Sequence, residues 1–230
     1  MKDTVIAIDG PSGSGKSTIA KIVANRLNLT YLDTGAMFRA IGFMLVNDKV
    51  DYEKDDQTVI NYLNSLEFEY GVDKNTLIQI NERNLTEKIR EHEVSKLASM
   101  VSKVNAVREY LKFIQRKIAS HKPSVLEGRD IGTVIFPNAA LKIYLTADSK
   151  VRAERRFNEL VEKDPSNKSK YTVESIQKDI ETRDYHDKNR EIAPLVKADD
   201  AVEIDTSFSS IEEVAEQVIS EYNKLENKFN

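Results

Sequence analysis

Apolar runs and amphipathic stripes alternate along most of the chain. Residues 5–8 form a short apolar run typical of a buried strand, apolar residues recur at helical spacing through 19–27, and a second run follows at 31–32. Further strand candidates occupy residues 124–126, 141–145 and 201–205. Because strand, helix and strand in succession build parallel sheets, the pattern predicts an α/β fold.

One stretch in the first half breaks this rhythm. Apolar and polar residues alternate over residues 66–70, a turn-like segment follows at 71–75, and residues 77–80 are typical of a second strand. One-sided alternation requires a partner surface, so we expect a small antiparallel insert that packs on the parent domain or folds over a ligand. A hairpin with no part in binding would give the same pattern.

Amphipathic helices are predicted for most of the second half. Apolar stripes at residues 94–101 and 107–118 indicate two helices with a break near Asn105. Residues 211–222 indicate a closing helix that packs against the core. Ser99 and Arg108 fall off the apolar stripes, which for most helix residues means exposure to solvent.

A polar tract at residues 162–170 separates two more predicted helices. The first begins near Ser149, and the second carries Val173, Ile176 and Ile180. We expect this region to form a lid. The chain is then a single domain with a core in residues 1–60, 91–150 and 195–230, an insert at about 61–90 and a lid at about 155–190.

Composition excludes several classes of protein. The 230 residues carry a net charge of −4 with both signs mixed, which argues against a nucleic-acid binder that relies on a basic surface. There is no cysteine and there are only three histidines, which excludes disulfides and thiolate zinc sites. No apolar run reaches membrane-spanning length, and the first strand leaves no room for a signal peptide. We expect a cytoplasmic monomer that binds neither nucleic acid nor membrane.

The segment after the first strand carries the clearest chemistry. Residues 10–18 match the pattern Gly-x4-Gly-Lys-[Ser/Thr], in which glycines turn successive amide groups into one concavity and a helix start adds positive charge. We expect Lys16 to neutralise the outer phosphates of a bound nucleotide and Ser17 to ligate Mg²⁺. The predicted ATP-binding residues are Gly10, Pro11, Ser12, Gly13, Ser14, Gly15, Lys16, Ser17 and Thr18. A plain connecting turn is the alternative.

Two more polar segments fall at the predicted carboxyl edge of the sheet, where ligands bind in such folds. Residues 33–39 pass from a turn to a helix and place Thr34 and Arg39 near its start. Residues 127–133 pack an acid, a base and an acid around glycines at a strand end. A ligand-binding loop and a solvated turn are both compatible with this segment.

Arg183, Asp187 and Arg190 are spaced by four and three residues. A continuing helix would place all three side chains on one face. Exposed ion pairs with no function would have the same spacing.

Taken in order, these motifs resemble the bacterial cytidylate kinases, a family of nucleoside monophosphate kinases. The match runs through residues 8–17, 32–39, 127–133 and 183–196, and therefore spans nearly the whole chain. Any nucleotide kinase shares the first segment, whereas the last two are more particular to these enzymes. The resemblance implies a three-layer P-loop NTPase fold and the reaction of ATP with CMP or dCMP to give ADP and CDP or dCDP, with Mg²⁺.

The resemblance also implies roles for individual residues. Phosphoryl transfer needs positive groups aimed at one point, and the family positions for the acceptor phosphate are Arg39 and Arg129, with Thr34 as a hydroxyl donor. Arg183 and Asp187 are expected at the sugar, and Arg190 at the base or the transferring phosphate. Arg155 and Arg156 are expected near ATP. The catalytic set implied is Lys16, Arg129, Arg183, Asp187 and Arg190.

The family positions that read the base are Ser99, Arg108 and Asp130. An aspartate accepts a hydrogen bond from the cytosine amino group but faces a bare oxygen in uracil, so it discriminates between the two. Phe38 departs from the tyrosine usual in the family, which leaves stacking but removes a hydroxyl. No aspartate follows a strand as an obvious second metal ligand, so Asp33 is expected at most as a water-mediated helper.

Two alternatives remain open at this level. One is a kinase of UMP or AMP. The other is a P-loop switch that binds nucleotide without catalysis, although the chain has no Asn-Lys-x-Asp guanine motif and such a switch has no evident use for the motif arginines.

Overall fold

The computed structural model describes residues 3–54 and 57–226, and the chain divides into two compact units. Unit 1 comprises residues 1–32 and 119–230, and unit 2 comprises residues 33–118. Each unit contributes strands to a sheet of its own kind, parallel in unit 1 and antiparallel in unit 2.

The parallel sheet of unit 1 confirms the predicted α/β fold. Within the described ranges it has five strands in the order β2-β6-β1-β7-β8. Their bounds are β1 Asp3–Asp9, β2 Thr30–Asp33, β6 Ser124–Gly128, β7 Ala139–Thr146 and β8 Val202–Asp205. The central strand β1 runs parallel to both β6 and β7, so the carboxyl ends of all three meet at one edge, where loops carry the polar motifs.

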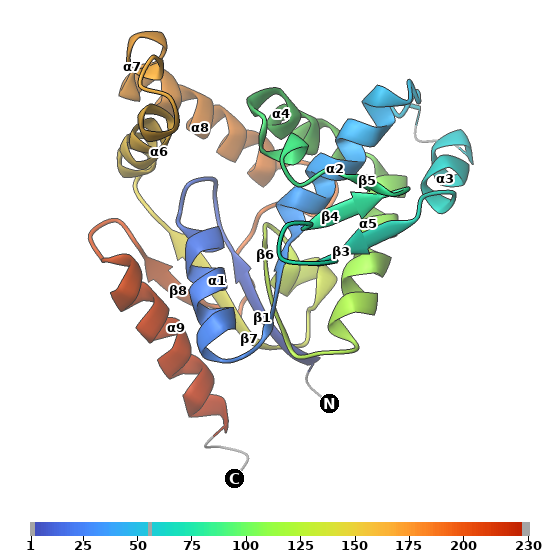
Figure 1. Cartoon of the computed structure of the whole chain (residues 1–230). Coiled ribbons are helices and arrows are strands. Elements are labelled where there is room, and N and C mark those ends of the chain that lie inside the picture. The colour runs from blue at the N-terminus through green and yellow to red at the C-terminus, as the bar shows by residue number, and fades with distance from the viewer. Residues whose placement is uncertain (1–2, 55–56, 227–230) are drawn as a thin grey trace. The chain divides into compact units, whose positions relative to one another are not determined.

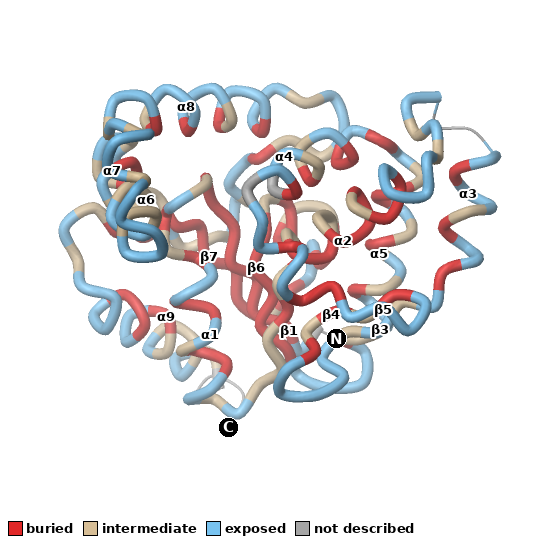
Figure 2. Tube along the Cα trace, turned by 45° about the horizontal axis from the view of Figure 1, so that its top comes forward, coloured by how far each residue is buried: buried red, intermediate tan, exposed pale blue. Residues whose placement is uncertain are grey.

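Apolar side chains from strands and helices form the core of unit 1. Helices α1 (Lys16–Arg26) and α9 (Ile211–Glu226) lie side by side against the sheet (Figure 1). Ile19 and Val23 of α1 pack with Val214 and Val218 of α9 and with strand residues such as Ile8. Strands β6 and β7 are buried along most of their length (Figure 2), which explains why their sequences are nearly continuous apolar runs.

Three helices form the predicted lid region of unit 1. They are α6 (Ser149–Lys163), α7 (Asn167–Lys170) and α8 (Val173–Asn189), drawn together in Figure 1. Ala153 packs with Ile176 and Ile180 in a small core of their own. The side chain of Asp148 caps α6, and a capping box at Thr172 starts α8, so both helix starts are specified locally. The short helix α7 inside the polar tract was not predicted.

The insert of unit 2 is antiparallel, as predicted. In the described part of the chain three strands pair in the order β3-β4-β5, with β3 at Phe68–Tyr70, β4 at Ile78–Ile80 and β5 at Arg83–Asn84. The third strand was not predicted. It follows a turn in which two non-glycine residues, Asn81 and Glu82, have positive φ angles.

Helices make up the rest of unit 2. Their bounds are α2 Thr34–Asn47, α3 Gln57–Asn64, the short 3₁₀ helix Lys88–Arg90, α4 His92–Val101 and α5 Asn105–Ala119. The break predicted near Asn105 is confirmed, since α5 begins there. Helix α3 was not predicted, and it buries Val59 and Leu63 on one face.

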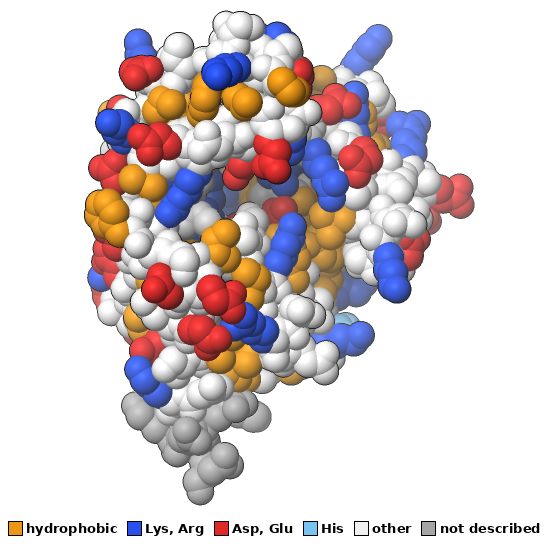
Figure 3. All heavy atoms as spheres, turned by 60° about the vertical axis from the view of Figure 1, so that its left-hand side comes forward, with side chains coloured by type: hydrophobic (Ala, Val, Ile, Leu, Met, Phe, Trp, Pro, Cys, Tyr) orange, Lys and Arg blue, Asp and Glu red, His pale blue; other side chains and the backbone are white. Residues whose placement is uncertain are grey.

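Charged side chains of both signs are interspersed on the face drawn in Figure 3, in keeping with the small net charge. Within the described ranges, no helix combines the length and apolar character needed to cross a bilayer.

Candidate functional site in the phosphate loop and its neighbours

The phosphate loop, residues 10–18, connects β1 to α1 in a conformation that only glycine allows at its first position. Gly10 has a φ of 150°, and a Cβ there would lie 2.1 Å from the carbonyl oxygen of Leu145. Outside groups also hold the loop. The Arg152 guanidinium donates to the carbonyl of Ser12 at 2.9 Å, and the Thr206 hydroxyl donates to that of Ser14 at 3.2 Å.

Lys16 is buried at the start of α1, and its pKa is well below that of an ordinary lysine. Its ammonium donates to the carbonyl of Pro11 at 2.7 Å. Burial, reinforced by the positive charge of Arg129, lowers the pKa of Lys16 to about 7, although the negative charges of Glu127 and Asp9 act in the opposite direction. Lys16 and Arg129 therefore lie close enough to repel each other, and a bound anion would offset this repulsion.

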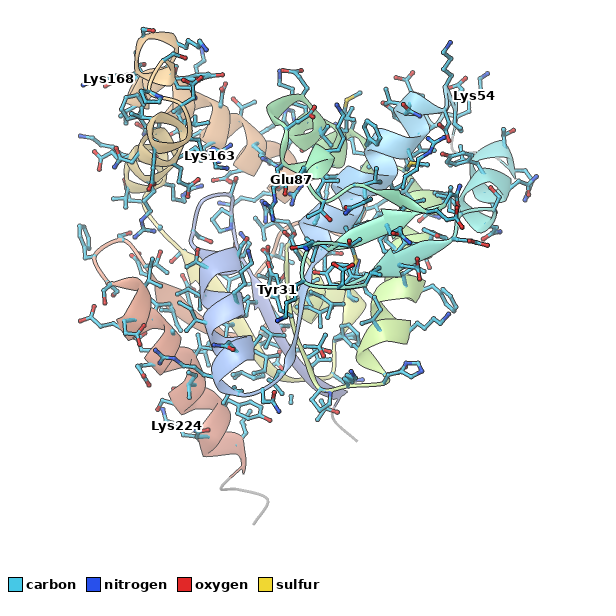
Figure 4. The ribbon with its side chains drawn as sticks, in the orientation of Figure 1. Tyr31, Lys54, Glu87, Lys163, Lys168 and Lys224 are labelled. Atoms are coloured by element: carbon cyan, nitrogen blue, oxygen red, sulfur yellow. The ribbon has the colours of Figure 1, made fainter. Side chains whose placement is uncertain are left out.

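A carboxylate that sequence reasoning missed lies beside the predicted metal ligand. The Ser17 hydroxyl donates to Oε1 of Glu127 at 2.6 Å, and the hydroxyl of Tyr31, labelled in Figure 4, lies 3.4 Å from the same oxygen. Glu127 is the last residue but one of β6, which pairs in parallel with β1, and this pairing brings Glu127 close to the phosphate loop. An acid at the end of the strand that neighbours β1 was the available signal.

These two oxygen donors fit Mg²⁺. Serine hydroxyl and carboxylate oxygens are hard ligands, and Mg²⁺ in nucleotide sites takes one or two protein ligands with phosphates and waters completing its shell. Across the described residues no group of three or more His, Cys, Asp or Glu side chains gathers at one point.

Arg129 and Asp187 form an ion pair 58 residues apart in sequence, in which Asp187 is buried and Arg129 is half-buried. Nε of Arg129 donates to Oδ2 of Asp187 at 2.8 Å. Burial works against the charge on each, but the pair outweighs it: Asp187 raises the pKa of Arg129, and Arg129 holds the pKa of Asp187 below its usual range. Arg190 and Arg183 act on Asp187 in the same direction.

Arg190 approaches Asp130 but not from a helix. Helix α8 ends at Asn189 and Arg190 follows in an extended conformation, so the helix that would place residues 183, 187 and 190 on one face does not continue to Arg190. Nη2 of Arg190 lies 3.6 Å from Oδ1 of Asp130, and both side chains are buried. The chain after α8 turns back, since Leu195 N–H donates to the carbonyl of Asp187 at 2.8 Å.

The remaining arginines of α6 contact protein groups. Arg155 donates to the hydroxyl of Thr206 at 3.0 Å, and Arg156 pairs with Glu159 on the exposed face of the same helix. The part expected of Arg155 and Arg156 in binding ATP stays a prediction.

In unit 2, the start of α2 organises the predicted phosphate-binding residues. Asp33 caps α2 by accepting from Ala36 N–H at 2.7 Å, and its other oxygen lies 3.2 Å from Nη2 of Arg39. Thr34 is buried in the first turn. Nε of Arg39 is a buried donor with no hydrogen-bond partner among the described residues, which suits it to an anionic ligand.

Arg108 is buried, contrary to what its place off the apolar stripe indicated. Its guanidinium donates to the carbonyl of Ser102 at 3.2 Å and lies 5.7 Å from the ring of Phe38. The Ser102 hydroxyl in turn donates to the carbonyl of Ser99 at 2.9 Å. Ser99 and Arg108 are thus linked within unit 2, whereas Asp130 belongs to unit 1.

A model of the cytidylate kinase family matches residues 6–224. The chain belongs to this family. A cytidylate kinase of Clostridioides difficile is 43% identical over 223 residues, covering 97% of this chain and 100% of that protein. One of Fusobacterium nucleatum is 40% identical over 225 residues, with 98% and 100% covered. The resemblance that the motifs indicated is confirmed.

Some relatives are longer. A bifunctional pantoate ligase/cytidylate kinase of Prochlorococcus marinus is 43% identical over 221 residues, covering 95% of this chain but 42% of that protein. The chain therefore spans less than half the length of such relatives. Among solved structures, a shikimate kinase from Acinetobacter baumannii matches with a TM-score of 0.46 at 15% identity, covering 98% of this chain and 95% of that chain.

Proposed function

We propose that the chain transfers a phosphoryl group from ATP to CMP or dCMP. The observation that carries this is the placement of two cations, the buried Lys16 and the half-buried Arg129, beside the phosphate loop, where Arg129 is close enough to lower the pKa of Lys16. Such an arrangement is costly unless an anion binds, and a phosphoryl group in transfer is the anion that a phosphate loop presents. The chain's membership of the cytidylate kinase family supports CMP as acceptor.

Unit 1 would hold the donor. Backbone amides of the phosphate loop and the ammonium of Lys16 bind the phosphates, while Ser17 and Glu127 hold Mg²⁺ directly or through water. When bound, Mg²⁺ neutralises charge on the phosphate oxygens. Arg129, held by Asp187 and by the carbonyl of Gly128, would donate its other N–H groups to the charge that develops on the transferring group.

The acceptor phosphate would be bound by guanidinium groups. Arg39 keeps Asp33 as a partner through Nη2, and its unpartnered Nε supplies a donor for a phosphate oxygen. Thr34 adds a hydroxyl. No acid or base catalyst is needed for this step, because the acceptor phosphate is already ionised at neutral pH.

Base recognition would combine a carboxylate with a guanidinium. Asp130 would accept a hydrogen bond from the cytosine amino group, and Arg108 of α5 would donate to the ring acceptors. Ser99 of α4 would assist Arg108. Arg190 would fix Asp130, and Arg183 with Asp187 would contact the sugar. Discrimination against UMP follows because its carbonyl would leave the Asp130 carboxylate unpaired.

Measurement of ADP release with CMP, dCMP, UMP and AMP as acceptors tests the proposal. We expect CMP and dCMP to be preferred at least about tenfold over UMP and AMP. Lys16→Ala should lose most of the turnover, whereas Lys224→Ala, an exposed lysine paired with Glu221, should leave it unchanged. A preference for UMP or AMP would refute the cytosine assignment, and nucleotide binding without transfer to any acceptor would favour a switch.

A further inference from the structure

Asp9 is a buried carboxylate to which the proposed mechanism gives no part. It is the last residue of β1, directly before the phosphate loop, and its side chain is shielded from solvent. Oδ1 accepts from the N–H of Ile131 at 2.9 Å, and Oδ2 accepts from the N–H of Gly132 at 2.7 Å. Both oxygens are therefore used on two successive amide groups 122 and 123 residues away in sequence.

Those two amides open the helical turn that follows Asp130. Residues 131–135 form a single π-helical turn, and its first two N–H groups need an acceptor that the turn itself does not supply. The carboxylate of Asp9 satisfies both with one charged group. This holds the backbone at the residue that follows Arg129 and Asp130.

The contact is built tightly. A Cβ on Gly132 would lie 3.4 Å from Oδ2 of Asp9 and 3.1 Å from Cδ of Lys142. Lys142 is itself fixed by an ion pair of 2.7 Å with Asp200. A side chain at position 132 would therefore press on the stem of Lys142, whereas its contact with Asp9 would be an ordinary one.

We propose that Asp9 is a positioning residue that sets the place of Arg129 and Asp130 through the backbone of residues 131–132, and so couples the phosphate loop to recognition of the acceptor. This rests on the proposed function. Asp9 directly precedes the phosphate loop, and its carboxylate binds the segment that contains the proposed base-reading residue Asp130. Its removal should degrade base discrimination more than donor binding.

Asp9→Asn tests the two hydrogen bonds without a change in side-chain volume. The asparagine amide group keeps one acceptor oxygen but turns an NH₂ toward the second N–H, so one of the two hydrogen bonds is lost while the volume stays the same. Asp9→Ala removes both. Asp73→Asn is the matched control, because Asp73 also accepts from two backbone N–H groups, those of Asn75 and Thr76, in an exposed turn of unit 2.

The comparison of CMP with UMP separates this role from effects on the donor. The charge of Asp9 raises the pKa of nearby Lys16, so its loss also alters the electrostatics of ATP binding. That effect is common to both acceptors and cancels in the ratio of their kcat/KM values. We expect Asp9→Asn to lower the CMP/UMP ratio about tenfold and Asp9→Ala to lower it further, with Asp73→Asn at the wild-type ratio.

Amide hydrogen exchange of Ile131 and Gly132, followed by NMR, tests the contact without reference to activity. We expect exchange at one or both amides to accelerate at least about tenfold in Asp9→Asn, with the amides of β1 unchanged. An unchanged CMP/UMP ratio in both Asp9 variants would overturn the positioning role, as would unchanged exchange at both amides. Wild-type enzyme that fails to phosphorylate CMP would instead refute the proposed function, and this inference with it, even if the exchange result confirmed the contact.

Discussion

At the scale of single residues, Lys16 illustrates how the site favours an anion before one is bound. Burial is the largest influence on its pKa and disfavours the ammonium, and the charge of Arg129 adds to it. Glu127, Asp9 and Asp187 pull the other way but do not restore the ordinary value. With its pKa lowered to about 7, Lys16 gives up its proton more readily near physiological pH than an ordinary lysine does.

Nucleotide binding should therefore be accompanied by proton uptake. A polyphosphate beside Lys16 raises its pKa, so between the free value of about 7 and the higher bound value the complex holds more protons than the separate partners. Calorimetric titration with ADP near pH 8 in two buffers of different ionisation enthalpy measures this uptake, which we expect to be about half a proton or more. Lys16→Arg is the control, because arginine stays protonated and should show no uptake. Equal uptake in both proteins would assign the proton to another group.

At the scale of elements, periodicity predicted most helices and strands of the described chain. It did not predict the short elements whose formation depends on tertiary contacts. Strand β5 has two exposed residues and depends on a turn with positive φ at Asn81 and Glu82, which no residue type there announces. Helix α3 is only eight residues long and is stabilised by burying Val59 and Leu63. Short elements carry too few periods to stand out in sequence.

The site residues also differ in whether they could be predicted from local sequence or depend on contacts between distant segments. Residues 10–18 were predictable because their chemistry is contained in one contiguous loop. The pairing of Arg129 with Asp187 joins positions 58 apart, and the end of α8 before Arg190 depends on a turn that brings Leu195 back to Asp187. Spacing along one segment cannot predict such contacts, which is also why Glu127 was missed as the neighbour of Ser17.

One buried ion pair ties three elements of unit 1 together. The Arg152 guanidinium of α6 pairs with Asp184 of α8 at 2.7 Å, and it also bonds the carbonyls of Ser12 in the phosphate loop and Ala147 before α6. Both side chains of the pair are buried. Loss of one partner would leave a buried charge uncompensated.

Asp184→Asn should accordingly destabilise the protein. We expect the free energy of unfolding to fall by about 3 kcal/mol, because Arg152 keeps its charge and loses its counter-ion. Urea denaturation followed by circular dichroism measures the change. Glu181→Gln, on the exposed side of the same helix, should change stability by less than about 1 kcal/mol. A loss of similar size in both variants would show that α8 is sensitive to any change of charge.

At the scale of the whole molecule, the residues that the family resemblance assigns to one reaction are shared between two units. Lys16, Arg129 and Asp130 belong to unit 1, and Arg39 and Arg108 to unit 2. Each unit fixes its own members through internal contacts: Asp187 holds Arg129, and Asp33 holds Arg39. The proposed function thus requires that groups held independently act on a common substrate. The monomeric state expected from the sequence stays a prediction.

A double-mutant cycle between Arg39 and Arg129 tests this requirement. Two guanidiniums that bind one phosphate group stabilise the same transition state, so the loss in the double variant Arg39→Ala/Arg129→Ala should differ from the sum of the single losses by about 1–3 kcal/mol, calculated from kcat/KM for CMP. Arg39 paired with Arg26 is the control, since Arg26 binds Glu212 and Glu216 on α9, and its removal should add within about 0.5 kcal/mol. Additive losses for Arg39 and Arg129 would mean that the two arginines act on different groups, and one of them would then not bind the acceptor phosphate.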